Sequence, residues 1–300
     1  GAAASRTTRS TARSKASAGA AGAASVAKFG RSTSSSREIN VQSAHPSSAL
    51  SQGGEIVKGG YRIYWQRWLM LFYMSALNLL SDWTCYSVAP ISVLTREAFG
   101  DVDPELLVVI FLGANAVASM CEPIILSRLG LRKTVVFGSL LLMVGSIVKS
   151  GGVPLIMQSN LEQGKGEWRV YLGFFLVGLS QPLYQCTPAL LSASWFPEKE
   201  RTMATGIALN SNQLGIGCAF VFGTLLVATS DDIVPYFELL SLIATITFVG
   251  CAMQFDDAPP TPPSETARVM RGTVEINVPS MGDMKNMITM SIRGAANLAS

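Results

Sequence analysis

Residues 68–94 read WLMLFYMSALNLLSDWTCYSVAPISVL, an apolar run in which Asp82 is the one charged side chain. A helix needs about 20 apolar residues to cross about 30 Å of hydrocarbon, so this run is long enough to span a membrane. A carboxylate in the middle of such a helix costs at least ~3 kcal/mol on insertion scales, and residues of this kind face a bundle interior or a watery cavity. The run therefore predicts a membrane helix with one polar, functional face.

Five more apolar runs follow along the chain. The predicted helices span 68–94, 105–127, 134–148, 171–194, 203–229 and 234–254. Only 14% of all residues are charged, whereas a soluble domain carries about a quarter. These features predict an all-α membrane protein with six transmembrane helices, which is half of a two-repeat transporter.

Three segments differ in composition. Residues 1–60 are rich in Ala, Ser, Gly and Arg, which predicts a disordered basic tail. The same acid-poor composition is typical of an organelle transit peptide, so that alternative stays open. Residues 61–255 hold the six helices. Residues 256–300 begin with the Pro-rich DDAPPTPPS, which cannot continue a helix, and predict a cytosolic linker with a short amphipathic helix over 281–300.

The loop charges predict an orientation. Two loops on one side of the predicted bundle carry the basic residues Arg128, Arg132, Lys133, Lys199 and Arg201. The loops on the opposite side carry Glu97, Asp101, Asp103, Asp231 and Asp232, together with the basic Lys165 and Arg169. The positive-inside rule makes the first side cytosolic, so both ends of the chain are cytosolic as well. Lys149, at the end of the third helix, is expected to extend its ammonium group to the interface. We expect a multi-pass integral protein of the plasma membrane, and the alternative is an organelle membrane.

Polar residues near Asp82 lie on one face of the first helix. Asn78 and Tyr86 are four residues before and after it, and Trp83 is its neighbour about 100° around the helix. A carboxylate beside an indole ring suits a cation, through Coulomb attraction and cation–π contact. Alternatively, Asp82 pairs with a residue of a facing half or stays protonated within the packing.

The fourth and fifth helices add amide side chains. Gln181 and Gln185 are one turn apart, and Pro182 interrupts the helix between them, which is tolerated where a helix lines a cavity. Gln213 of the fifth helix is a further candidate for ligand contact. For each of these residues, hydrogen bonding between helices without a ligand is the alternative.

The cytosolic end of the second helix holds a candidate gate. Glu122 lies near the basic loop, where it would form a gate or a structural ion pair. The predicted gating and loop-motif residues are Glu122, Arg128, Gly130, Arg132 and Lys133.

Several classes of function lack their motifs. The five cysteines stand singly in apolar runs, so neither a metal site nor a disulfide is expected. No nucleophile, dinucleotide or phosphate-loop motif predicts an enzyme or a cofactor. No basic patch interleaved with aromatics predicts nucleic-acid binding. The partners expected are membrane lipid, a small-molecule substrate and a second six-helix half.

Several stretches resemble known transporters. SRLGLRK (127–133) resembles the loop motif of major facilitators, although Ser127 stands where that motif has an acid. SWFPEKERTMATGIALNSNQLGIG (194–217) resembles the feline leukaemia virus subgroup C receptor family of major facilitators. WTCYS (83–87) and PPS (262–264) agree with the same family. The resemblance implies the N-terminal half of a twelve-helix major facilitator fold.

The resemblance also implies a substrate. Members of that family move choline, ethanolamine or related cations, and some are linked to haem or vitamin export. The family's choline pocket uses a Trp and a Gln that fall on Trp83 and Gln181, whereas Asp82 replaces its usual amide. We expect transport of a small organic cation by alternating access. The alternatives are export of haem or another metabolite, and a non-transporting receptor or scaffold subunit.

Overall fold

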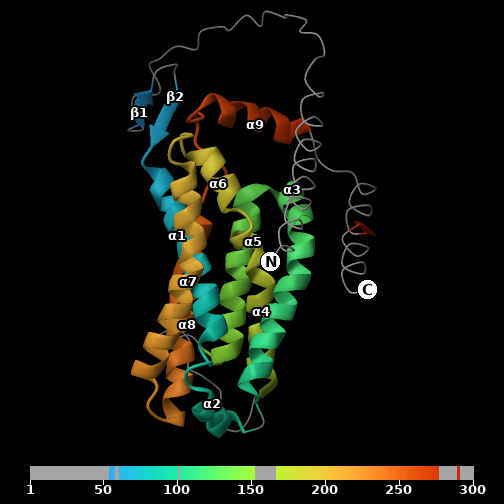
Figure 1. Cartoon of the computed structure of the whole chain (residues 1–300), viewed down its shortest axis with the longest axis vertical. Coiled ribbons are helices and arrows are strands. Elements are labelled where there is room, and N and C mark those ends of the chain that lie inside the picture. The colour runs from blue at the N-terminus through green and yellow to red at the C-terminus, as the bar shows by residue number, and fades with distance from the viewer. Residues whose placement is uncertain (1–53, 58–60, 101, 153–166, 277–288, 291–300) are drawn as a thin grey trace, which may run out of the picture. The chain divides into compact units, whose positions relative to one another are not determined.

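The computed structural model describes residues 54–57, 61–100, 102–152, 167–276 and 289–290. Its helices, in chain order, are α1 Gln66–Tyr86, α2 Ser92–Phe99, α3 Pro104–Ser150, α4 Glu167–Ser180, α5 Pro182–Gln185, α6 Pro188–Trp195, α7 Arg201–Leu226, the 3-10 turn η2 Ser230–Asp232, α8 Ile233–Gln254 and α9 Glu265–Ile276. The long helices lie side by side, with α2 at one end of the bundle and α9 at the other (Figure 1). Each of the six predicted runs is largely helical in the described chain, although the helix boundaries differ from those predicted.

Two helical segments, Pro104–Ser150 and Ser230–Gln254, are each long and apolar enough to cross a membrane. The first of these is bent at Gly130, whose φ of 79° and ψ of 172° are not helical. Glycine adopts a positive φ without the steric cost that a Cβ would bring. The sequence predicted two helices here with a loop between them, and the structure joins them across this one residue.

The predicted helix over 171–194 is broken twice. Pro182 starts α5 directly after α4, and Pro188 starts α6 after a short irregular step at Cys186 and Thr187. Proline lacks the amide hydrogen that would bond to the carbonyl four residues earlier. The Thr187 hydroxyl donates to the Tyr184 carbonyl at 3.2 Å, which satisfies the oxygen that Pro188 leaves free.

The first predicted helix is shorter than expected. It ends at Tyr86 rather than at residue 94, and Ser92–Phe99 forms the separate helix α2. Pro90 lies between them and, lacking an amide hydrogen, cannot donate to the helical ladder. The polar residue Asp82 therefore lies in the last turns of α1.

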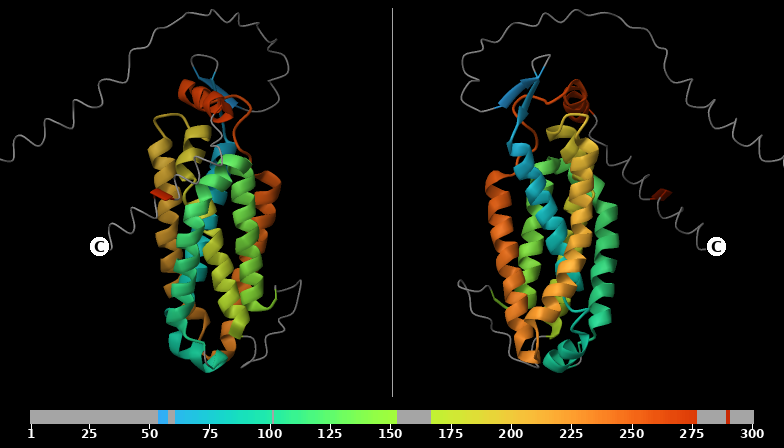
Figure 2. Two further views of the ribbon diagram at one scale, coloured as in Figure 1. Left: turned by 90° about the vertical axis from the view of Figure 1, so that its right-hand side faces the viewer. Right: turned by 60° about the vertical axis from the view of Figure 1, so that its left-hand side comes forward.

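Glycines determine how closely the long helices pack. α1 packs on α7, and α3 packs on both α4 and α8, as the two views of Figure 2 show. A Cβ on Gly215 of α7 would overlap the Leu79 carbonyl of α1, and a Cβ on Gly173 of α4 would lie 2.6 Å from the Lys149 Cβ of α3. Small residues at these points let helix backbones approach closely, as is usual inside membranes.

The ends of the chain correct two expectations. β1 (Gly54–Val57) and β2 (Tyr61–Tyr64) form an antiparallel hairpin, so residues 54–57 are a strand within the segment predicted to be disordered. α9 follows the Pro-rich exit, where only a linker was expected. The rest of the tail lies outside the described residues, and so does nearly all of the helix predicted over 281–300.

Candidate functional site

Asp82 forms the centre of a buried polar cluster between helices. Its side chain is 8% exposed, and its Oδ1 accepts a hydrogen bond of 2.6 Å from Nε2 of Gln181. The two residues are far apart in the sequence and come from α1 and from the step between α4 and α5. The structure thus brings together two of the predicted substrate contacts, Asp82 and Gln181.

Gln181 lies at the junction of two helices. It is the residue between Ser180, where α4 ends, and Pro182, where α5 begins. Its own backbone stays helical, with φ of −57° and ψ of −48°, and its carbonyl accepts the Gln185 amide at 2.9 Å. The backbone therefore remains helical where it passes Asp82.

Asn115 of α3 is a third member of the cluster, which the sequence analysis did not identify. Its Nδ2 donates to Oε1 of Gln181, and its own carbonyl accepts a bond of 2.8 Å from the Ser119 hydroxyl. A lone amide among the apolar residues of 111–118 was the signal that could have revealed it. Asp82, Gln181, Asn115 and Ser119 form one polar chain across α1, α4–α5 and α3, which we call the polar track.

Trp83 faces a different part of the bundle. Its Nε1 donates to the Tyr236 hydroxyl of α8 at 2.9 Å, and its ring stacks on Phe222 of α7 with 5.0 Å between centroids. Asp82 faces α4, whereas Trp83 faces α7 and α8. The contacts of this conformation therefore do not bring the indole ring and the carboxylate to one ligand.

The other predicted ligand contacts differ in burial and in hydrogen bonding. Asn78 is fully buried, and its Nδ2 donates to the Ala208 carbonyl of α7 at 3.2 Å, which is a helix-to-helix contact. Its Oδ1 has no hydrogen-bond partner. Tyr86 and Gln185 are half-buried, and Gln213 is exposed on α7. None of these four side chains forms a hydrogen bond with the polar track among the described residues.

The predicted loop motif contacts an acidic pair after α8. The Arg132 amide donates to Oδ1 of Asp257 at 2.6 Å, and its guanidinium lies 3.6 Å from Oδ1 of Asp256. A Cβ on Gly130 would lie 3.3 Å from the same Asp257 oxygen. These two aspartates supply the negative charge that Ser127 does not. The remaining motif residues Arg128 and Lys133 are exposed.

Glu122 was predicted to form a gate or a structural ion pair, and the structure bears on the second of these roles. It is buried in α3 and forms none of the ion pairs found among the described residues. Its Oε1 has no hydrogen-bond partner. Arg132 pairs with Asp256 instead, so the predicted ion pair between Glu122 and Arg132 is wrong for this conformation, and the gate stays a prediction.

Lys149 also departs from expectation. Instead of reaching the interface it is fully buried, with its ammonium 3.3 Å from the Ser87 hydroxyl. The ammonium lies over the rings of Phe237, at 4.2 Å from the centroid, and Phe174, at 5.0 Å. Close packing of α3 on α4 and α8 covers the side chain before it can leave the bundle.

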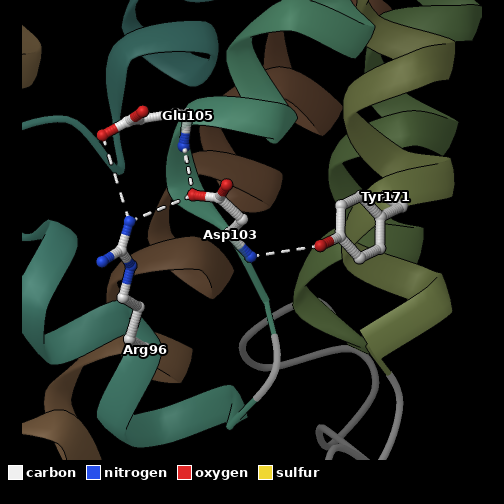
Figure 3. Close-up of polar contacts among 4 residues, drawn as sticks. All are labelled: Arg96, Asp103, Glu105 and Tyr171. Carbon is white, nitrogen blue, oxygen red and sulfur yellow. Dashed lines mark hydrogen bonds and ion pairs between the residues drawn. The ribbon is translucent and has the colours of Figure 1, made fainter.

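An exposed ion cluster joins α2, α3 and α4 (Figure 3). Arg96 lies 3.2 Å from Oδ1 of Asp103 and 4.0 Å from Glu105. Asp103 also caps α3 by accepting the Glu105 amide, and its own amide donates to the Tyr171 hydroxyl. Exposed pairs of this kind contribute little free energy to folding.

The cysteines and acids offer no metal site in the part of the chain that the structure describes. Cys85, Cys121, Cys186, Cys218 and Cys251 are all free thiols. No group of three or more His, Cys, Asp or Glu side chains gathers there.

Comparison with known proteins agrees with the helical architecture. Residues 65–291 match the family model of the Major Facilitator Superfamily. Solute carrier family 49 member A3 of Xenopus tropicalis is 31% identical over 227 residues, which cover 71% of this chain and 46% of the relative. Choline/ethanolamine transporter flvcr2a of Danio rerio is 24% identical over 212 residues, covering 68% and 43%. Choline/ethanolamine transporter FLVCR1 of Mus musculus is 26% identical over 229 residues, covering 69% and 39%.

The chain spans less than half the length of these curated relatives. The resemblance read from residues 83–87 and 194–217 is confirmed, because relatives of that kind match most of the helical region. Such relatives are integral membrane transporters, and the match runs through every helix from α1 to α9. The chain belongs to the major facilitator superfamily.

Proposed function

We propose that this chain is one six-helix half of a transporter for a small organic cation. The observation that carries the proposal is the buried carboxylate of Asp82, which accepts a hydrogen bond of 2.6 Å from Gln181 at the junction of α4 and α5. The names of the choline/ethanolamine transporters among the relatives support the same substrate class.

The chemistry of Asp82 favours a positively charged ligand. An ionised carboxylate in a membrane interior is costly, and it persists where it faces a cavity or a counter-charge. Gln181 stabilises one oxygen without neutralising the charge, and Asp82 forms no ion pair among the described residues. A substrate ammonium would supply the missing positive charge.

Trp83 contributes to the proposal through the family resemblance. An indole face binds quaternary ammonium groups through cation–π attraction. Because the ring is packed on Phe222 here, we propose that it turns toward Asp82 during the transport cycle. Gln213, Gln185, Tyr86 and Asn78 remain proposed contacts of the same substrate.

The proposed mechanism is alternating access between this half and a second half. Six spans place both ends of the segment on the cytosolic side, in the plasma membrane or an organelle membrane. Two interfaces would then move against each other around the substrate, as in transporters built from repeats. The exposed apolar side chains of α7, which include Leu214, Phe220 and Leu225, suit contact with a second half or with lipid.

The test is uptake of labelled choline and ethanolamine by the full-length protein, with the uncharged choline analogue 3,3-dimethylbutanol as the comparison. Asp82→Asn removes the charge and keeps the shape, so uptake efficiency for the cations should fall at least about tenfold, the equivalent of one charged contact. Glu265→Gln, at an exposed acid of α9, is the matched control and should leave uptake unchanged.

Two outcomes would contradict the proposal differently. Unchanged cation uptake in both Asp82→Asn and Trp83→Ala would reject the site. Absence of uptake by the wild-type protein, with normal surface expression, would favour a receptor or scaffold role.

A further inference from the structure

Glu122 is a buried carboxylate that the site described above does not use. Glu122 lies on the part of α3 that precedes the bend at Gly130. Its side chain is 5% exposed, and its Oε1 has no hydrogen-bond partner. A buried polar atom without a partner is costly, and most such atoms in folded proteins have one. An ionised carboxylate in this state would be stabilised by a cation that enters from outside the chain.

The helix geometry places Glu122 along the polar track. Asn115 and Glu122 are seven residues apart, which puts them on the same side of α3 and about 10 Å apart along its axis. Ser119 lies between them and donates to the Asn115 carbonyl. The polar face of α3 thus continues from the cluster around Asp82 to Glu122.

α4 and the step that follows it run alongside the part of α3 that precedes Gly130. Gly178 of α4 lies against Phe111 and Ala114, and Gln181 bonds Asn115. Extended by two turns along both segments, this register would place Glu122 opposite the step between α5 and α6. The Cys186 thiol at this step lies within electrostatic reach of Glu122, in agreement with that register.

The step between α5 and α6 reaches the surface of the described chain. Cys186 is exposed, and Pro188 prevents the helical hydrogen bonds that would otherwise close the segment. Irregular backbone at membrane depth is tolerated where it is buried in protein or lines a water-filled cavity. An exposed thiol beside the break favours the second of these settings.

We propose that Glu122 is a second contact for the transported ammonium group, one stage further along the polar track than Asp82. This inference rests on the proposed function. A cation leaving Asp82 passes Gln181, Asn115 and Ser119 and meets a second carboxylate about two helical turns away. Two stations of like charge let a cation move in steps, without one deep site that retains it.

Transport by the full-length protein gives the first test. Choline is added on the side of the membrane from which it reaches Asp82 before Glu122. In Glu122→Gln, its KM should stay within about twofold of the wild-type value, because binding at Asp82 is retained. The maximal rate should fall about tenfold, because passage beyond Asp82 is impaired. Glu105→Gln, an exposed acid of the same helix with its side chain 88% exposed, is the matched control and should change neither constant. Equal kinetics in Glu122→Gln and wild type would overturn the inference.

Thiol labelling of Cys186 tests the charge without relying on transport. In full-length protein with Cys121→Ser and Cys218→Ser, a cationic methanethiosulfonate bearing a trimethylammonium group should label Cys186 faster than an anionic sulfonate analogue. Glu122→Gln should lower this rate ratio about tenfold, because one fixed charge attracts the cationic probe and repels the anionic one. Labelling is read at the Cys186 peptide by mass spectrometry, with Glu105→Gln as the control.

The two readouts separate the hypotheses. A Glu122-dependent labelling ratio without choline uptake would reject the proposed substrate and retain the cation contact. Choline uptake with an unchanged ratio, or no labelling of Cys186 at all, would overturn the contact and leave the proposed function standing.

Discussion

Lys149 is a charged residue that packs like an apolar one. Its stem fills the contact between α3 and Gly173 of α4, and its ammonium lies over Phe237 and Phe174. Burying an ammonium costs several kcal/mol, which the aromatic faces and the Ser87 hydroxyl offset only in part. The side chain therefore contributes through its volume more than through its charge.

Replacing Lys149 should separate these two contributions. Lys149→Met keeps most of the volume and removes the charge, so the free energy of unfolding should stay within about 1 kcal/mol of wild type or rise. Lys149→Ala leaves a cavity and should lose about 2–4 kcal/mol. Thermal unfolding of the purified full-length protein measures both. Equal losses in the two variants would show that the ammonium itself is required.

Helix contacts at the element scale depend on where the glycines lie. Gly215 touches the α1 backbone at Leu79, whereas Gly217, two residues later on α7, has open space where a Cβ would stand. In the interior of a helix, Ala is favoured over Gly by roughly 0.5–1 kcal/mol when nothing obstructs its Cβ. The same substitution should therefore have opposite effects at the two positions.

Gly215→Ala should lower stability by about 2 kcal/mol or more, because α1 and α7 must move apart to admit the Cβ. Gly217→Ala should leave the melting temperature unchanged or raise it. Melting of both full-length variants, followed by fluorescence-detected size exclusion, measures the difference. Similar melting temperatures would contradict the α1–α7 contact described here.

The whole molecule raises the question of how many times the chain crosses the membrane. Six spans require the connection around Gly100 and the turn Ser230–Asp232 to lie outside, and the loop at 197–200 to lie in the cytosol. Arg132 with Asp256 and Asp257, and Arg67 with Glu200, form ion pairs or hydrogen bonds at the end expected to be cytosolic.

Glycan mapping tests this arrangement in the full-length protein. A spaced Asn-x-Thr acceptor placed after Gly100 or after Ser230 should be glycosylated, because both loops would face the lumen during synthesis. The same insert after Glu198 should remain unmodified. Glycosylation at the third position, or at only one of the first two, would require a different number of spans.

Much of the fold and part of the site could be read from residue type and spacing. The helices followed from long apolar runs, and Asp82 and Gln181 followed from polar residues in such runs and from Pro182 next to one of them. Asn115 was missed, although it is a lone amide in an apolar run, because its partner Gln181 lies 66 residues away along the chain. Glu122 was assigned an ion pair because sequence distance to Arg128 and Arg132 says nothing about the direction of a buried side chain.

The sequence by itself determined the helical membrane class, the family and the carboxylate at the centre of the site, because hydrophobic run length, proline and charge act locally. Only the tertiary structure decided which side chains meet. In it, Trp83 donates a hydrogen bond to Tyr236, Lys149 is buried, and the Arg132 amide donates to Asp257, 125 residues away along the chain. Those outcomes depend on the register at which helices pack, and that register is set by contacts between segments that are distant along the chain.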